Sequence, residues 1–221
     1  MSDAPVFQHI PAVLEGKKIR LCALQESHFG DLIALGLDKR IWTHYPFDLG
    51  MAGRHLRHLL EIMEQVKAGV CQAFTVFHAK HHYPVGMTRL FQLHKEHRQC
   101  ETGSWLAPAY WENGMNTEAK FLLLCHCFEA LQLLRVQFRT DTRNVPSRHS
   151  LEKLGAQFEG IIRKERVLEN GTVRDAALYS IVDSDWPAVR AGLLQKVMAW
   201  KEADLNQHFL KHDVSSSYVY P

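Results

Sequence analysis

The chain has 221 residues, of which 46% are hydrophobic and 23% charged, proportions typical of a folded globular protein. Lysine and arginine total 26 against 24 acidic residues, and this net charge of +2 is too small for the broad positive surface of a dedicated nucleic-acid binder. No apolar run approaches the roughly 20 residues of a membrane span, and the first ten residues lack the basic start and apolar core of a signal peptide. We therefore expect one cytoplasmic domain with an extension, and neither a nucleic acid nor a membrane as partner.

Cysteine and histidine usage favours neither a disulfide framework nor a metal site. The five cysteines form an odd set without a C-x-x-C pair, which fits a reducing compartment, and Cys125 and Cys127 are expected to be core thiols. Histidine is abundant, at 14 residues, and five of these stand close enough in sequence to suggest metal ligands. They are His78, His81, His82, His94 and His97. They fall in polar turns without the glutamate or cysteine partners of familiar sites, so no metal is expected.

The first half of the chain predicts strands and helices around an aromatic loop. Alternating β-forming residues indicate a strand over residues 19–24, and apolar residues at helical spacing indicate helices over residues 25–35 and 51–68. The loop at residues 41–50 separates these helices. Three strand-like runs follow, joined by polar turns, so an antiparallel meander is expected. They cover residues 73–78, 85–93 and 100–106.

The second half predicts a buried helix between two strands. Residues 117–131 form a helix that is apolar on nearly every side, so it is expected to be the most buried element. Its thin polar stripe consists of Glu118, His126, Glu129 and Gln132. The further elements are a strand at 136–141, a helix at 147–154, strands at 158–168 and 174–182 joined by the turn 169–171, and a helix from 186 to about 205. The crossover places strands 100–106 and 136–141 roughly parallel, and the fold class is α+β.

A turn-rich segment, residues 108–119, opens the long helix. Free backbone N–H groups and the positive end of the helix dipole at such a start stabilise an anion. Gly114 removes the side chain where phosphate oxygens would approach. A glycine before a helix is also ordinary turn punctuation, so this segment alone leaves both readings open.

A second segment, residues 144–160, supplies the motif that makes the first informative. It contains Asn-x-x-Ser followed by Leu-Gly-Ala and Glu-Gly, formed by Asn144, Ser147, Leu154, Gly155, Ala156, Glu159 and Gly160. The first segment contributes Trp111, Gly114, Thr117, Glu118 and Ala119 in the matching order and spacing. With both segments, the chain resembles the RimJ/RimL-like branch of the GNAT acetyltransferase superfamily from about residue 16 to residue 180.

The resemblance implies a GNAT-like mixed, mainly antiparallel sheet with a β-α-β crossover and splayed central parallel strands, flanked by helices. The acetyltransferase domain would span residues 16–183, after an N-terminal segment 1–15 and before a C-terminal helical extension and tail, 184–221. Family members often form dimers, so a homodimer is allowed. The implied activity is N-acetyl transfer from acetyl-CoA, without a metal, to an amine that attacks the thioester directly. The alternative is an inactive CoA-binding sensor or interaction module.

The same resemblance implies the residues that hold acetyl-CoA. The cofactor-binding candidates are Trp105, Leu106, Trp111, Asn113, Gly114, Met115, Asn116, Thr117, Asn144 and Arg148. Trp105 and Leu106 would offer main-chain groups to the pantetheine, as an added strand would. Two residues depart from the usual loop: Asn116 would compete for the phosphate N–H groups if it were the helix N-cap, and Glu112 is expected to point to solvent.

The catalytic candidates are Glu101, as the base, and Ser147, as the proton donor to the departing thiolate. Their structural alternatives are an exposed strand-edge glutamate and an N-cap serine, and Asn144 is alternatively a turn residue. Protein or peptide N-termini and small amines all remain acceptors, although an α-amine with a pKa of about 7.7 to 8 is easier to deprotonate than a lysine near 10.4.

The acceptor-side candidates are Trp42, Tyr45 and Phe47, which equally fit an apolar loop anchor. Arg54, Arg57 and His58 either attract an acidic acceptor or form a solvated helix face.

Overall fold

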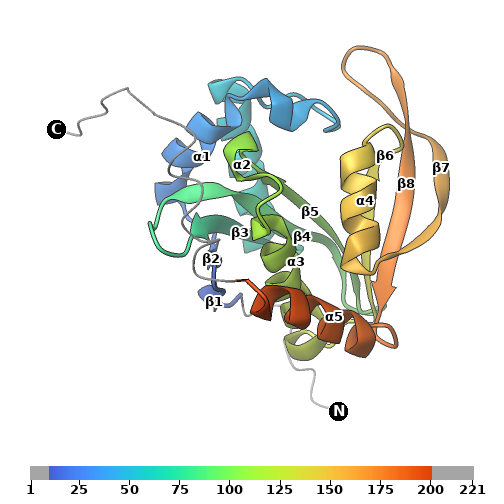
Figure 1. Ribbon diagram of the computed structural model, residues 1–221. Coiled ribbons are helices and arrows are strands. Elements are labelled where there is room, and N and C mark those ends of the chain that lie inside the picture. Colours follow the sequence, from blue (N-terminus) through green and yellow to red (C-terminus); the bar gives the residue numbers. More distant parts are fainter. Residues whose placement is uncertain (1–9, 201–221) are drawn as a thin grey trace.

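The computed structural model describes residues 10–200, which form an eight-stranded sheet covered by helices (Figure 1). The strand order across the sheet is β1-β2-β3-β4-β5-β6-β8-β7. The strands are β1 (Val13–Glu15), β2 (Ile19–Ala23), β3 (Cys71–His78), β4 (Pro84–His94), β5 (Gln99–Leu106), β6 (Arg135–Asp141), β7 (Gln157–Val167) and β8 (Val173–Val182). The α-helices are α1 (Phe29–Gly36), α2 (Ala52–Lys67), α3 (Met115–Cys125), α4 (Val145–Leu154) and α5 (Trp186–Met198). Short 3₁₀ turns occupy Glu26–His28, Lys39–Trp42 and Pro108–Tyr110, and a π-helical turn, His126–Ala130, prolongs α3.

The centre of the sheet holds the one parallel strand pair of the described residues, β5 with β6. This pairing covers three residues of each strand and ends where Glu101 lies opposite Gln137. Beyond that point the strands separate, and Figure 1 shows β6, β8 and β7 (yellow to orange) leaning away from the blue-to-green part of the sheet. We call this region, residues 102–106 of β5 and 138–141 of β6, the divergence. The splayed parallel strands expected from the sequence are therefore confirmed.

Apolar side chains cover both faces of the sheet. On one face, called the α3 face, side chains of α3, α4 and α5 pack on alternate residues of the strands, such as Leu106, Phe138 and Tyr179. On the other, called the α2 face, α1 and α2 pack on the intervening residues, including Met87 and Trp105. Because strand side chains alternate, neighbouring residues of β5 point to opposite sides of the divergence.

The mixed α+β fold and its helix and strand order agree with the sequence, with differences at particular ends. Strand β1, three residues long and paired with β2, was not expected from so short a run. Helix α4 begins at Val145 rather than residue 147 because Asn144 caps it. Helix α5 ends at Met198, so the prediction of a helix to residue 205 is wrong at residues 199 and 200, and its last five residues lie outside the described residues. Between residues 10 and 200, no helix is long and apolar enough to cross a bilayer.

The polar stripe predicted for the long helix is wrong at two positions, which are buried. His126 is bonded to Gln72 across 2.7 Å. The Glu118 carboxylate accepts hydrogen bonds from the main-chain N–H groups of Lys17 and Lys18, both at 2.7 Å, and of Ile19 at 3.0 Å. Glu118 thus ties the start of α3 to the β1–β2 turn, a pairing between residues about 100 positions apart that helix periodicity cannot predict.

We expect Glu118→Gln to lower the free energy of unfolding by at least about 2 kcal/mol, because an amide turns a donor toward buried N–H groups that need an acceptor. Urea unfolding of the variant and the parent measures this difference. Glu96→Gln, at an exposed turn position, serves as the control and is expected to change stability little. Equal stability of the parent and Glu118→Gln would contradict the anchoring role.

Candidate functional site

The divergence leaves one edge of β5 without a partner strand. On its other side, β5 pairs with β4, and Ala107 N–H continues this ladder with a 2.9 Å hydrogen bond to Val85 O. Main-chain groups of an antiparallel strand alternate between its neighbours, so those of Leu106 face the divergence and those of Trp105 face β4. Leu106 O accepts a hydrogen bond from the Trp111 indole at 2.8 Å. Of the two residues expected to line a ligand with their main chain, Leu106 has the required orientation.

The loop before α3 combines the features of an anion site. Gly114 caps the helix with φ of 87°, a left-handed conformation that favours glycine. The Asn113 side chain accepts a hydrogen bond from Met115 N–H at 3.0 Å, while its buried amide nitrogen, Nδ2, has no partner. Lys18 donates to Asn113 O at 2.7 Å and so brings a positive charge to the loop. A buried donor without a partner, next to a helix N-terminus and an ammonium, suits a bound phosphate.

The loop conformation requires a glycine at position 114, independently of phosphate access. A Cβ built on it would come within 2.8 Å of the Trp200 ring, and the positive φ strains any other residue. Substituting Gly114 therefore tests the loop fold rather than a ligand. Trp200 and the neighbouring Lys18, whose ammonium lies 4.4 Å from the ring centroid, were not among the sequence candidates.

The two residues that depart from the usual loop, Asn116 and Glu112, leave the first N–H groups of α3 uncapped by a side chain of their own. Asn116 is not the N-cap, since Gly114 is, and its Nδ2 donates to Ser150 Oγ on α4 at 3.5 Å. Glu112 is exposed, as expected. Thr117, half-buried, lies in the first turn of α3. The N-terminus of α3 thus contacts the middle of α4 through the Asn116–Ser150 hydrogen bond.

Asn144 takes the N-cap role considered for Ser147, and Ser147 lies inside the first turn of α4. Asn144 Oδ1 accepts the Ser147 N–H at 3.2 Å, so Asn144 is the N-cap and the N-cap alternative for Ser147 is wrong. Ser147 and Ser150 are three residues apart on α4 and therefore share a helix face, the one that contacts α3. Arg148 turns away from that face, because its guanidinium donates to Tyr179 Oη at 3.2 Å and to Thr142 O at 3.4 Å. Ser147 thus lies on the same helix face as the α3 contact, and Arg148 does not.

Glu101 lies at the point where β5 and β6 separate, on the α2 face. It is 6% exposed, so the alternative of an exposed edge glutamate is wrong. Its Oε2 accepts hydrogen bonds from Arg139 Nε at 2.6 Å and from Gln137 Nε2 at 3.1 Å. Arg139 also forms an ion pair with Glu101, and a weaker one with Glu165 at 3.9 Å. A buried carboxylate that is paired with an arginine thus lies at the base of the divergence.

The three aromatic candidates of the acceptor side come together on the α2 face. The Trp42 ring lies 5.1 Å from Tyr45 and 5.4 Å from Trp105, and Tyr45 lies 5.4 Å from Phe47. Trp42 is 4% exposed and its indole donates to Gly36 O at 2.7 Å, so its replacement would chiefly open a cavity. Tyr45 and Phe47 are half-buried and remain the accessible members of the group.

The basic residues considered for acceptor attraction are partly engaged elsewhere. Arg54 forms an ion pair with Glu169 in the β7–β8 turn. His58 lies against the Phe47 ring at 4.9 Å, and burial, helped by the charge of Arg89, lowers its pKa to about 4. His58 is therefore neutral at physiological pH and supplies no charge.

His55 provides a test of this packing through pH. It is 1% exposed between Trp42 and Trp105, neither ring nitrogen has a partner, and burial lowers its pKa to about 4. In the unfolded chain the ring takes up a proton near pH 6.5, so the free energy of unfolding falls as pH drops from about 6.5 to about 4. We expect His55→Leu to remove up to about 1.4 kcal/mol per pH unit from this slope.

Urea unfolding at pH 7, 6, 5 and 4 measures the slope for each protein. His149→Leu, at an exposed position of α4, should keep the slope of the parent. A His55→Leu slope equal to that of the parent would show that His55 is protonated in the folded protein.

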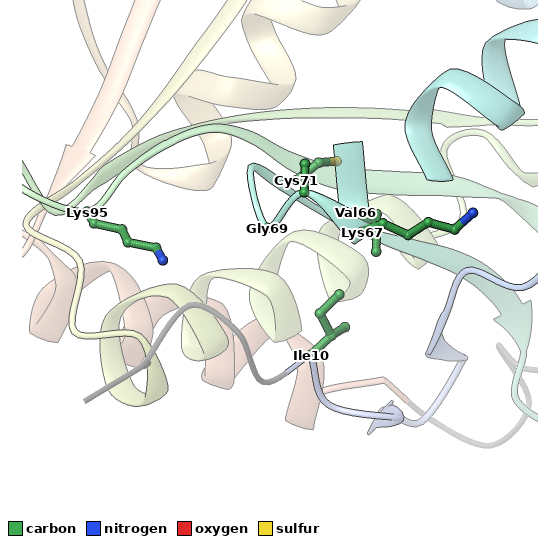
Figure 2. A pocket seen from close by; sticks show the side chains of 7 residues that line it. Ile10, Val66, Lys67, Gly69, Cys71 and Lys95 are labelled. Carbon is green, nitrogen blue, oxygen red and sulfur yellow. The ribbon is translucent and has the colours of Figure 1, made fainter. Parts of the chain in front are cut away.

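A surface pocket of about 230 Å³ lies apart from these residues (Figure 2). Figure 2 shows it beside the end of α2 and the start of β3. It is lined by Ile10, Val66, Lys67, Ala68, Gly69, Cys71 and Lys95, none of which is a predicted site residue. Within residues 10–200, no three histidine, cysteine or acidic side chains gather as metal ligands, and the five cysteines are free thiols.

The family model and the relatives named below are all acetyltransferases. Residues 18–157 match the family model described as acetyltransferase (GNAT) domain. Curated relatives include the uncharacterized N-acetyltransferase YoaA of Bacillus subtilis (strain 168), 35% identical over 98 residues, 44% of this chain and 55% of that protein. Another is the spermidine N(1)-acetyltransferase of Escherichia coli (strain K12), 30% identical over 103 residues, 47% of this chain and 55% of that protein. The chain thus spans about half the length of these curated relatives.

Solved structures extend the likeness over most of the chain. A probable acetyltransferase of the GNAT family from Chromobacterium violaceum ATCC 12472 superimposes with a TM-score of 0.73 at 27% sequence identity. The superposition covers 81% of this chain and 90% of that one.

Proposed function

Since the chain belongs to the GNAT acetyltransferase family, we propose that it is an acetyl-CoA-dependent N-acetyltransferase of the RimJ/RimL-like branch, with its reaction centre at the divergence. The single observation that carries this proposal is the buried, unpartnered Asn113 amide beside the α3 N-terminus, at the end of an unpaired strand edge. The branch assignment rests on the two sequence motifs.

The residues of the loop suit the charged part of acetyl-CoA. Asn113 Nδ2 and the first N–H groups of α3 would hold the pyrophosphate, with Lys18 adding positive charge. The main-chain groups of Leu106 would hold the extended pantetheine as a neighbouring strand would. Asn116, from the start of α3, and Ser147 and Asn144, from the start of α4, would line the opposite side.

Bound acetyl-CoA supplies an activated acetyl group, and the side chains at the divergence would manage the protons of its transfer. Glu101, on the α2 face, would take the proton of the attacking amine directly or through water. Ser147, on the α4 face that contacts α3, would give a hydrogen bond or a proton to the departing sulfur. The acceptor would approach from the α2 face, past Tyr45 and Phe47.

The acceptor class is an amine, either a protein or peptide N-terminus or a small amine. Small amines are included because one relative is named as a spermidine acetyltransferase. An α-amine costs about 1 to 1.4 kcal/mol to deprotonate at pH 7, against about 4 to 5 kcal/mol for a lysine, so it needs less help from Glu101. A thiol-release screen with acetyl-CoA against peptides, polyamines and aminoglycosides would identify the acceptor.

Asn113→Asp tests the proposed donor site. The carboxylate keeps an acceptor for Met115 N–H but places negative charge where the amide donor was, so CoA affinity is expected to fall at least about tenfold. Isothermal titration with CoA measures it. Asn170→Asp is the matched control, because Asn170 accepts the Thr172 N–H in the same way, at 3.0 Å, in the β7–β8 turn. Parental CoA affinity in Asn113→Asp would refute the site, and CoA binding without turnover of any amine would favour the inactive alternative.

A further inference from the structure

A buried lysine reaches into the divergence from the side opposite Glu101. Lys120, on α3, is 8% exposed. Its Nζ donates to Ser104 Oγ on β5 at 2.8 Å and to Thr102 Oγ1 at 3.3 Å, and it lies 5.5 Å from the centroid of the Phe138 ring on β6. Ser104 and Phe138 both lie beyond the last paired residues of their strands. The ammonium therefore lies on the α3 face, next to both strands where they separate.

This lysine has no carboxylate partner among the described residues. The ion pairs of residues 10–200 do not include Lys120, and its titratable neighbours are two buried thiols, Cys127 on the π-helical turn and Cys100 on β5. Burial lowers the pKa of Lys120 to about 8, and burial also holds Cys127 in its neutral thiol form by raising its pKa. An ammonium in such a place is costly unless a negative charge comes to it.

Hydroxyl groups surround Lys120 and make its site suitable for a charged ligand atom. Thr88 Oγ1 and Ser104 Oγ are 2.6 Å apart, and together with Thr102 they form a small polar patch inside the otherwise apolar α3 face. Because β5 side chains alternate, Lys120 and this patch lie on one side of the divergence and Glu101 on the other. A thioester held along the unpaired edge of β5 would lie between an ammonium and a carboxylate.

We propose that Lys120 is a further catalytic residue, which stabilises and protonates the CoA thiolate that leaves during acetyl transfer. This inference rests on the proposed function. The amine nitrogen forms a bond to the carbonyl carbon, the C–S bond breaks, and its electron pair stays on sulfur. Lys120 Nζ gives that sulfur a proton, and the neutral amine regains one from solvent. The proton released by the acceptor passes to Glu101 or to water.

The chemistry of the two groups is matched. A free thiol titrates near 8.5, close to the value for Lys120, so proton transfer between them is nearly balanced. Ser147, from α4, would supply a hydrogen bond to the same sulfur, and Lys120 adds the charge that a hydroxyl lacks. An ammonium that faces the sulfur lowers the pKa of the bound thiol relative to free CoA.

The affinities of CoA and of desulfo-CoA, which carries hydrogen in place of the thiol, test the proposal without an acceptor. Isothermal titrations are run at pH 6.5, 7.5 and 8.5 with the parent, Lys120→Met and the control Lys67→Met, whose lysine pairs with Glu64 on the surface of α2. In the parent and the control, the preference for CoA over desulfo-CoA is expected to grow about tenfold for each unit by which the thiol pKa falls on binding. In Lys120→Met this growth is lost.

The melting temperature of Lys120→Met is a second readout. Removal of an unpaired buried ammonium should leave it equal to that of the parent or higher, whereas a structural lysine would lower it. Lys120→Gln, which keeps a donor for Ser104, replaces the methionine variant if that one does not fold. An equal pH response in the parent and the uncharged variant overturns the proposal. If the parent binds neither ligand, the proposed function is itself wrong.

Discussion

Replacing Glu101 by glutamine is expected to lower kcat about 10²- to 10⁴-fold, the usual contribution of a general base. The loss should be greatest at low pH, where the acceptor amine is protonated and most needs a base. Glutamine keeps the shape of the side chain and its contact with Gln137, but it removes the negative charge that faces Arg139. Initial rates of thiol release from pH 6 to 9, with saturating acetyl-CoA, measure the effect.

Glu159→Gln is the matched control for the lost ion pair. Glu159 on β7 accepts two hydrogen bonds of 2.5 Å from Arg135, at the paired start of β6 and outside the divergence. If Glu101 only anchors Arg139, then Glu101→Gln, like Glu159→Gln, should lower stability and leave kcat near that of the parent. That outcome would remove Glu101 from the mechanism.

Ser147→Ala is expected to lower kcat by a similar factor, with little change in CoA affinity or melting temperature. The hydroxyl proposed to serve the leaving sulfur is lost, while the N-cap of α4 stays intact because Asn144 provides it. The structure thus sharpens this experiment, since no capping bond of Ser147 is removed along with the hydroxyl. Steady-state kinetics and thermal unfolding of the same preparation give the three quantities.

Ser150→Ala is the companion variant, one turn along the same face of α4. Its hydroxyl is bonded to Asn116 at 3.5 Å, so its loss tests the contact between α3 and α4. We expect a weaker affinity for CoA and a kcat close to that of the parent. If Ser147→Ala, in contrast to our expectation, keeps the parental kcat, then Ser147 is not the proton donor and that role falls to Lys120 or to water.

The periodic elements of the fold followed from the sequence because their apolar residues repeat at helix or strand spacing. The meander, the crossover and the closing hairpin agree with the structure for this reason. Strand β1 was missed because three residues carry no period, and its place depends on pairing with β2. The predicted start of α4 is two residues late because Asn144, and not Ser147, caps the helix.

The site was predictable where a motif fixes it and unpredictable where distant residues meet. Asn113 and Ser147 came from motifs, and the structure adds their partners. Glu118 belongs to the loop motif, but its bonds to the β1–β2 turn depend on tertiary contact. Lys120 looked like one more residue of an apolar helix, and nothing local in the sequence indicates that it reaches two diverging strands. The sequence offers only one hint of an unusual role, which is a lysine within an otherwise apolar run.

Hydrogen–deuterium exchange with and without CoA shows whether acetyl-CoA binds at the divergence. On CoA binding we expect slower exchange at the Ser104 and Leu106 amides and across residues 113–117, with unchanged exchange at residues 67–71 beside the pocket of Figure 2. Protection confined to residues 67–71, or unchanged exchange along β5 and the α3 N-terminus under saturating CoA, would contradict binding at the divergence.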